Sequence, residues 1–105
     1  MKAFLIDPAA RRIEAVEFDG SLEAVRGLIG HPKIDSDEID HTGGDRLFFD
    51  EECFLRGDAA AGRFQLDWLA PVSGKGVVTG PQLAGAGLSA ASIDAQALLA
   101  RVKFG

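Results

Sequence analysis

The chain has 105 residues, a formal net charge of -5 and a single cysteine, Cys53. This length suits one domain, and the negative charge argues against a nucleic-acid binder, because such proteins contact phosphates through a clustered basic surface. One cysteine cannot form an internal disulfide, so a reducing compartment is expected. The short apolar start of the chain predicts neither a signal peptide nor a membrane span. We therefore expect a cytoplasmic protein that contacts neither nucleic acid nor membrane.

Two short runs of β-branched and aromatic residues open the chain, Lys2 to Ile6 and Ile13 to Phe18. Asp7-Pro8 starts the turn between them, which predicts a β-hairpin. Ser21 then offers an N-cap for a helix with apolar residues at three- and four-residue spacing, and Gly30 ends it. Because only one face of this helix is apolar, we expect it to lie across a sheet.

The middle of the chain predicts a second hairpin. The polar segment Lys33 to Asp40 alternates weakly, which is typical of an exposed edge strand. A turn at His41 to Asp45 leads to the next strand, Arg46 to Asp50. Further strands are expected at Phe64 to Leu69 and at Val77 to Thr79.

The remaining segments contain mostly small residues. Gly57 to Gly62 predicts a loop tip, and Gly80 to Ala91 predicts a connector with little to pack. Ser92 is expected to cap a final helix, Ile93 to Lys103, which docks on the body or on a second copy of the chain, or else forms a mobile C-terminal arm. The domain organisation predicted is a core at residues 1–80, a connector at 81–91 and a C-terminal helix at 92–105. The fold class predicted is α+β, a mostly antiparallel sheet of about five short strands with one helix packed across it.

A glycine-lysine loop is the candidate ligand-binding site: Ser73, Gly74, Lys75 and Gly76. Glycines let backbone N–H groups approach an anion, and a lysine adds positive charge, so a ligand of the phosphate or nucleotide type is one hypothesis. The segment lacks the second glycine and the Lys-Ser/Thr pair of a Walker loop. The alternative is that the glycines only permit a bend into the strand that follows.

An acidic run offers oxygen and imidazole ligands for a cation: Asp35, Asp37, Glu38, Asp40 and His41. Its spacing fits no ligand template, and alternate residues of a strand diverge to opposite faces. A solvated edge strand is the expected structure, and no metal is predicted.

A second acidic run, together with the single tryptophan, is the candidate protein-binding surface: Asp50, Glu51, Glu52 and Trp68. The carboxylates would meet a basic partner, and an exposed aromatic ring would add apolar contact area. A solvated turn and a core tryptophan are the alternative interpretation.

Nucleophilic catalysis would require Cys53 with either His31 or His41 as the base. Cys53 follows Glu51 and Glu52, whose negative charges disfavour a reactive thiolate. No convergent motif accompanies these residues, so we predict no catalytic residue, no cofactor and no enzymatic activity.

Four segments resemble a family of short bacterial and phage-borne proteins catalogued only as a domain of unknown function. They are Met1 to Pro8, Glu14 to Gly20, Gly44 to Glu52 and Gly74 to Gly80. The sequence departs from the pattern of that family at Cys53 and at Ala59 to Ala61. The resemblance implies an accessory or anti-defence role in a mobile element, and it provides no catalytic residues to transfer.

The function predicted from these features is a small non-catalytic protein–protein interaction module. Its partner is expected to be another protein or a second copy of the chain, so a homodimer is one of the arrangements left open. The ligand binder at the glycine-lysine loop is one alternative. The other is an acidic DNA mimic, which requires six carboxylates on one face: Asp35, Asp37, Asp40, Asp50, Glu51 and Glu52.

Overall fold

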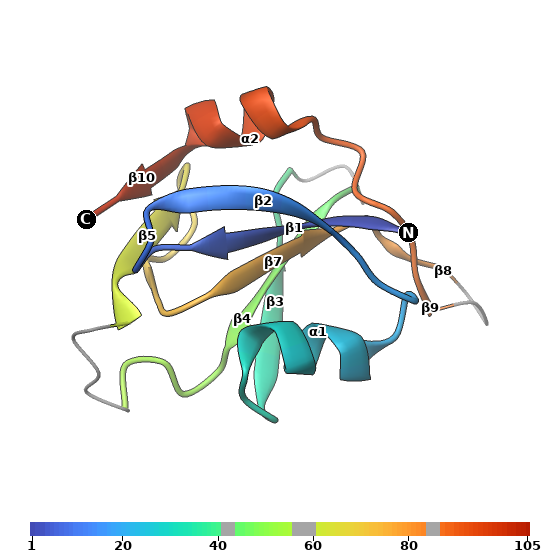
Figure 1. The fold of residues 1–105 in the computed structure, drawn as a ribbon, viewed down its shortest axis with the longest axis horizontal. Helices are drawn as coiled ribbons and strands as arrows, with labels where there is room; N and C mark the ends of the chain where they lie inside the picture. The colour runs from blue at the N-terminus through green and yellow to red at the C-terminus, as the bar shows by residue number, and fades with distance from the viewer. Residues whose placement is uncertain (41–43, 56–60, 84–86) are drawn as a thin grey trace.

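The main element of the protein is a five-stranded antiparallel sheet with the strand order β2-β1-β7-β4-β3 (Figure 1). The computed structural model describes residues 1–40, 44–55, 61–83 and 87–105. The strands of the main sheet are β1 (Lys2–Asp7), β2 (Arg12–Glu17), β3 (Ile34–Glu38), β4 (Arg46–Asp50) and β7 (Gly76–Thr79). The predicted α+β class and the mostly antiparallel sheet are confirmed.

Shorter elements surround this sheet. A three-stranded sheet has the order β10-β5-β6, and β8 pairs with β9. These strands are β5 (Arg63–Leu66), β6 (Val72–Ser73), β8 (Gln82–Leu83), β9 (Gly87–Leu88) and β10 (Val102–Phe104). The two helices of the described residues are α1 (Leu22–Ile29) and α2 (Ala95–Arg101). None of the described helices has the length and hydrophobicity needed to span a bilayer.

Local signals account for the first half of the fold. The hairpin of β1 and β2 and the hairpin of β3 and β4 form where they were predicted. Helix α1 begins after Ser21, whose Oγ accepts a hydrogen bond of 3.0 Å from the backbone N–H of Ala24. It ends at Gly30, which has a φ of 87° and donates its N–H to the carbonyl of Arg26. A left-handed C-cap of this kind favours glycine, because a side chain there is strained.

The central strands of the main sheet, β1, β7 and β4, are largely buried on both faces, to which successive residues of a strand point in turn. On one face, α1 contributes buried residues to a cluster with the strands: Val25 and Ile29 with Ala3, Leu5, Phe48 and Val77. On the other, the small sheet and α2 complete a second cluster: Phe64, Leu66, Leu98 and Val102 with Phe4, Ile6, Leu47 and Val78. Figure 1 shows α1 and α2 on opposite sides of the main sheet.

The prediction for the C-terminal segment was wrong in three respects. Helix α2 begins after Asp94, not Ser92, because the Asp94 carboxylate accepts a hydrogen bond of 2.7 Å from the N–H of Ala97. The chain then continues as β10, which pairs with β5, so the helix does not extend to Lys103. The segment is also no mobile arm, since Leu98 is fully buried.

Two further expectations need correction. The connector before α2 was predicted to pack little, yet Leu88 and Ala91 are buried, and β8 and β9 form within it. The strand predicted at Phe64 to Leu69 ends at Leu66, because Asp67 adopts a left-handed φ of 50°. The predicted turn at residues 41–45 and the predicted loop tip at 57–62 lie largely outside the described residues.

Candidate functional site

A cavity of about 540 Å³ lies at one end of the main sheet. Its walls come from the β1–β2 turn, the chain after α1, the end of β4 and the β6–β7 turn. The volume falls within the range of small-molecule sites, roughly 300–1,000 Å³. Three of the four predicted ligand-binding residues line it: Ser73, Gly74 and Lys75.

The strand register explains why charged residues meet at this end of the sheet. Ile6 of β1 pairs with Gly76 of β7, and Phe49 of β4 pairs with the same glycine. The next row of residues across these three strands therefore contains three neighbouring charged residues, all of which line the cavity: Asp7, Lys75 and Asp50. A single positive group thus lies between two carboxylates in the same row.

These charged residues lie on the same face of the sheet as the strand residues of the α1 cluster. Asp7, Lys75 and Asp50 are each two positions from an apolar residue of the α1 cluster, respectively Leu5, Val77 and Phe48. Side chains two positions apart in a strand share a face. Helix α1 has eight residues and ends at Ile29. Ile29 and His31, on either side of the helix terminus, line the cavity.

Two glycines shape the walls. Gly62 has a φ of 75°, and a Cβ at this position would lie within 2.9 Å of the backbone of Pro8 and Ala9 in the β1–β2 turn. Gly74 has a φ of 90° and donates its N–H to the carbonyl of Gly62 at 3.0 Å. Glycine at 62 therefore lets the chain before β5 approach the β1–β2 turn closely, and glycine at 74 permits the left-handed conformation of the β6–β7 turn.

Asp50 organises the opposite wall. Its side chain is 4% exposed, and Oδ2 lies 3.8 Å from Nε2 of His31. Oδ1 accepts a hydrogen bond of 3.1 Å from the N–H of Glu52, and the Asp50 carbonyl accepts one from the N–H of Cys53. These bonds hold the turn after β4 in place, with the buried free thiol of Cys53 in the cavity wall.

Lys75 is exposed and makes no ion pair or hydrogen bond with any residue in the described ranges. Its ammonium group is thus available to a ligand. The N–H of Gly74 is bonded to the carbonyl of Gly62, so this N–H is not available to an anion. Gly76 is buried within β7, where a Cβ would lie 2.5 Å from the ring of Phe64, so its role is packing.

The predicted protein-binding residues do not form one surface. Asp50 is buried, whereas Glu51 is exposed and Glu52 lies 4.0 Å from Nζ of Lys33. Trp68 is 57% exposed and follows β5, where it lines a separate groove beside β3. The tryptophan and the acidic turn are therefore distinct features.

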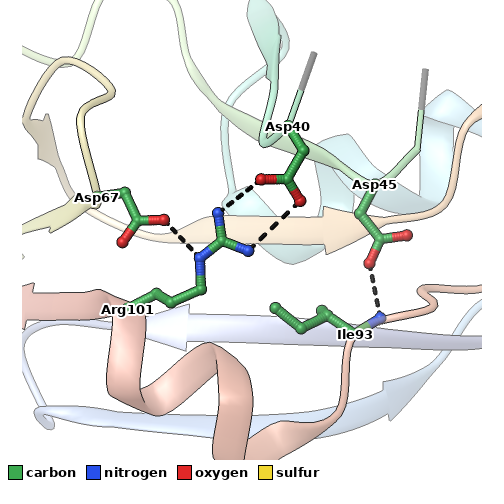
Figure 2. Close-up of polar contacts among 5 residues, drawn as sticks. All are labelled: Asp40, Asp45, Asp67, Ile93 and Arg101. Carbon is green, nitrogen blue, oxygen red and sulfur yellow. Dashed lines mark hydrogen bonds and ion pairs between the residues drawn. The ribbon is translucent and has the colours of Figure 1, made fainter. Parts of the chain in front are cut away.

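A second polar cluster connects the C-terminal segment to the rest of the domain through hydrogen bonds and ion pairs (Figure 2). Arg101 bonds to Asp40 at 3.0 Å through Nη2 and donates Nε–H to Asp67. The bond to Asp40 is the main reason that the pKa of Arg101 is raised above its ordinary value, with a smaller contribution from the bond to Asp67. The Asp45 carboxylate, 9% exposed as a residue, accepts the N–H groups of Ser92 and Ile93. This cluster was not predicted from the sequence.

The acidic residues considered as possible cation ligands are dispersed. Asp35 and Asp37 are exposed on β3, Asp40 pairs with Arg101, and His41 lies outside the described residues. Among the described residues no cluster of three potential ligands is close enough to hold a metal ion. The burial of Asp50 and the pairing of Asp40 also remove two carboxylates from the acidic face that a DNA mimic requires.

Comparison of the chain with protein-family models, curated proteins and solved structures finds no match. The resemblance to the phage-borne family therefore rests on the sequence segments alone and stays a prediction. The structure itself defines an α+β domain with a cavity of ligand size at the end of its main sheet.

Proposed function

We propose that the protein is a non-catalytic binding domain whose cavity holds a small phosphorylated compound that also carries hydrogen-bond donors, as a nucleotide does. The observation that carries this proposal is Lys75, which has no ion pair within the described ranges and lines a cavity of about 540 Å³. The proposal takes α1 to lie across one face of the sheet and to leave this end of that face open.

The charges of the cavity favour such a compound over inorganic phosphate. A phosphate group would bind the Lys75 ammonium, since charge-assisted hydrogen bonds are the strong ones. The carboxylates of Asp7 and Asp50 line the same cavity and would repel a bare anion, but they accept hydrogen bonds from hydroxyl or amino groups. A ligand that carries a phosphate group and hydrogen-bond donors can therefore bind both the lysine and the carboxylates.

The rest of the lining suits the apolar parts of a small molecule. Ala9, Ile29 and Ala61 contribute apolar surface beside the charged row. Cys53 adds a free thiol to the same wall, and a cytoplasmic location would keep it reduced. Binding sites commonly combine apolar walls with a few polar groups that orient the ligand.

Isothermal titration calorimetry with a purine mononucleotide, the matching nucleoside and inorganic phosphate tests the proposal. We expect the mononucleotide to bind more tightly than either of its parts. The Lys75→Ala variant should bind it at least about tenfold more weakly, the effect of losing one hydrogen bond to a charged group. Lys103→Ala, which removes the same charge from the exposed position of β10, should bind like the wild type.

Absence of binding heat at millimolar mononucleotide would reject the proposal. Equal affinities of the Lys75→Ala and Lys103→Ala variants would reject the assignment of the site. Chromatography of the nucleotide after incubation with the protein tests whether the domain is non-catalytic. We expect the nucleotide to be recovered unchanged. Release of a product would instead make the cavity an active site.

Protein binding is the second candidate function, and exposed Trp68 is the observation that favours it. Large aromatic side chains are enriched in the centres of protein interfaces. An accessory role in a mobile element follows from the sequence resemblance alone. A tagged pull-down that recovers a stoichiometric partner with the wild type but not with Trp68→Ala would support this function, whereas equal recovery by both would exclude Trp68 as the contact.

A further inference from the structure

We infer that the open edge of β3, together with Trp68, docks an extended basic segment of another protein. The inference rests on the second candidate function and is independent of the cavity. It commits to β-strand addition as the mode of binding, in which a partner segment extends a sheet by pairing with its edge.

Strand β3 is available for such pairing. It is the last strand in the order β2-β1-β7-β4-β3, and within the described residues its only strand partner is β4. The contacts at its two ends also face β4, because Lys33 accepts the N–H of Glu51 and Ile39 donates to Asp45. The outer side of β3 thus presents backbone groups without a strand partner, which is the template that an added strand requires.

A groove runs beside this edge. It has a volume of about 450 Å³ and lies between β3 and the turn that follows β5. Ser36, Asp37 and Glu38 line one side, and Trp68 and Leu69 line the other. Trp68 is 57% exposed, so its ring offers a surface on which a side chain of the added strand can pack.

The charge of the edge selects a basic partner. Arg46 is engaged within the sheet, since it donates hydrogen bonds to Ser36 Oγ and lies 3.5 Å from Glu38. Asp35 and Asp37 are exposed and make no ion pair with any residue of the described ranges. The edge therefore has two uncompensated negative charges, and a lysine or arginine could also pack its cation on the Trp68 ring.

A second copy of the chain is a poor occupant. Pairing β3 with β3 of another copy would bring Asp35 and Asp37 close to the same two carboxylates, and like charges on facing strands are destabilising. Residues two positions apart in a strand lie on one face about 6.6 Å apart. The complementary segment therefore carries lysine or arginine at alternate positions.

The test is an NMR titration of the isotope-labelled protein with a synthetic eight-residue peptide that alternates lysine and valine. We expect shift changes at β3 and at the Trp68 indole. A peptide of the same composition with its lysines consecutive should bind at least fivefold more weakly, and one with glutamate for lysine should not bind. The double variant Asp35→Asn, Asp37→Asn should lose at least fivefold in affinity for the alternating peptide.

The matched control is the double variant Glu14→Gln, Glu17→Gln on β2, which removes two exposed carboxylates from the other edge of the same sheet. It should retain wild-type affinity for the peptide. Equal losses in the two double variants, or shift changes outside β3 and Trp68, would overturn the inference. A protein partner captured equally by wild type and the β3 double variant would keep the interaction function and reject β3 as its site.

Discussion

Two polar regions of this protein differ in how their charges are satisfied. Around Arg101, each carboxylate has a partner from the chain: Asp40 and Asp67 bond the guanidinium, and Asp45 bonds backbone N–H groups before α2 (Figure 2). In the cavity, Lys75 has no partner within the described ranges, although two carboxylates share its row.

The difference separates a structural cluster from a binding site. A polar group that bonds within the chain contributes to folding, and its loss leaves its partners unsatisfied. A charged group that is held at a cavity without a partner contributes little to folding and remains available to a ligand. Substitutions around Arg101 should therefore change the free energy of unfolding, whereas substitutions in the cavity should change the affinity for a ligand.

The largest expected effect is at Asp45. Asp45→Ala removes the acceptor of the Ser92 and Ile93 N–H groups, which lie at 2.9 Å and 2.8 Å from it. We expect the free energy of unfolding to fall by about 3 kcal/mol, because hydrogen bonds to a charged group contribute about 1.5–3 kcal/mol each. Urea denaturation measures the change. Asp35→Ala, which removes an exposed carboxylate from β3, is the control and should change the free energy of unfolding by less than about 0.5 kcal/mol. Similar losses in both variants would show that the Asp45 hydrogen bonds do not stabilise the segment before α2.

A smaller effect is expected at Arg101, whose side chain is 26% exposed. Arg101→Gln should lower the free energy of unfolding by about 1 kcal/mol, the upper end for partly exposed ion pairs. Because the pKa of Arg101 is raised, its contribution is fully present below the ordinary arginine pKa and is lost only at strongly alkaline pH. Denaturation at 0.05 M and 1 M NaCl should show a smaller difference at high salt. Lys103→Gln is the control; a loss equal to that of Arg101→Gln would indicate a general charge effect.

Much of the first half of the fold was predictable because its signals are local. The two hairpins follow from strand runs separated by turns, and α1 follows from the Ser21 cap and Gly30. The C-terminal segment was not predictable in this way. Val102 and Lys103 were predicted to end the helix, but pairing with β5 decides the conformation of Val102 to Phe104, and three residues are too few to show a strand period.

The cavity was predictable only in part. The glycine-lysine loop pointed to Ser73, Gly74 and Lys75, since its composition is unusual within a few residues. The sequence did not indicate that Asp7 and Asp50 would join them, because this depends on β7 lying between β1 and β4. A usable signal was present, namely a charged residue at the end, or within two residues of the end, of each of three predicted strands, but only the strand order makes these residues neighbours.

The smallest expected effect on folding is at Lys75, and it tests the comparison most directly. Lys75→Ala should change the free energy of unfolding by less than about 0.5 kcal/mol, because the side chain is exposed and has no partner in the described ranges. A mononucleotide at ten times its dissociation constant should stabilise the wild type by about 1.4 kcal/mol, and the variant by much less. Urea denaturation with and without the ligand measures both quantities. A loss of more than about 1 kcal/mol without ligand, comparable to the loss expected for Arg101→Gln, would make Lys75 a structural residue and would remove the distinction between the two regions.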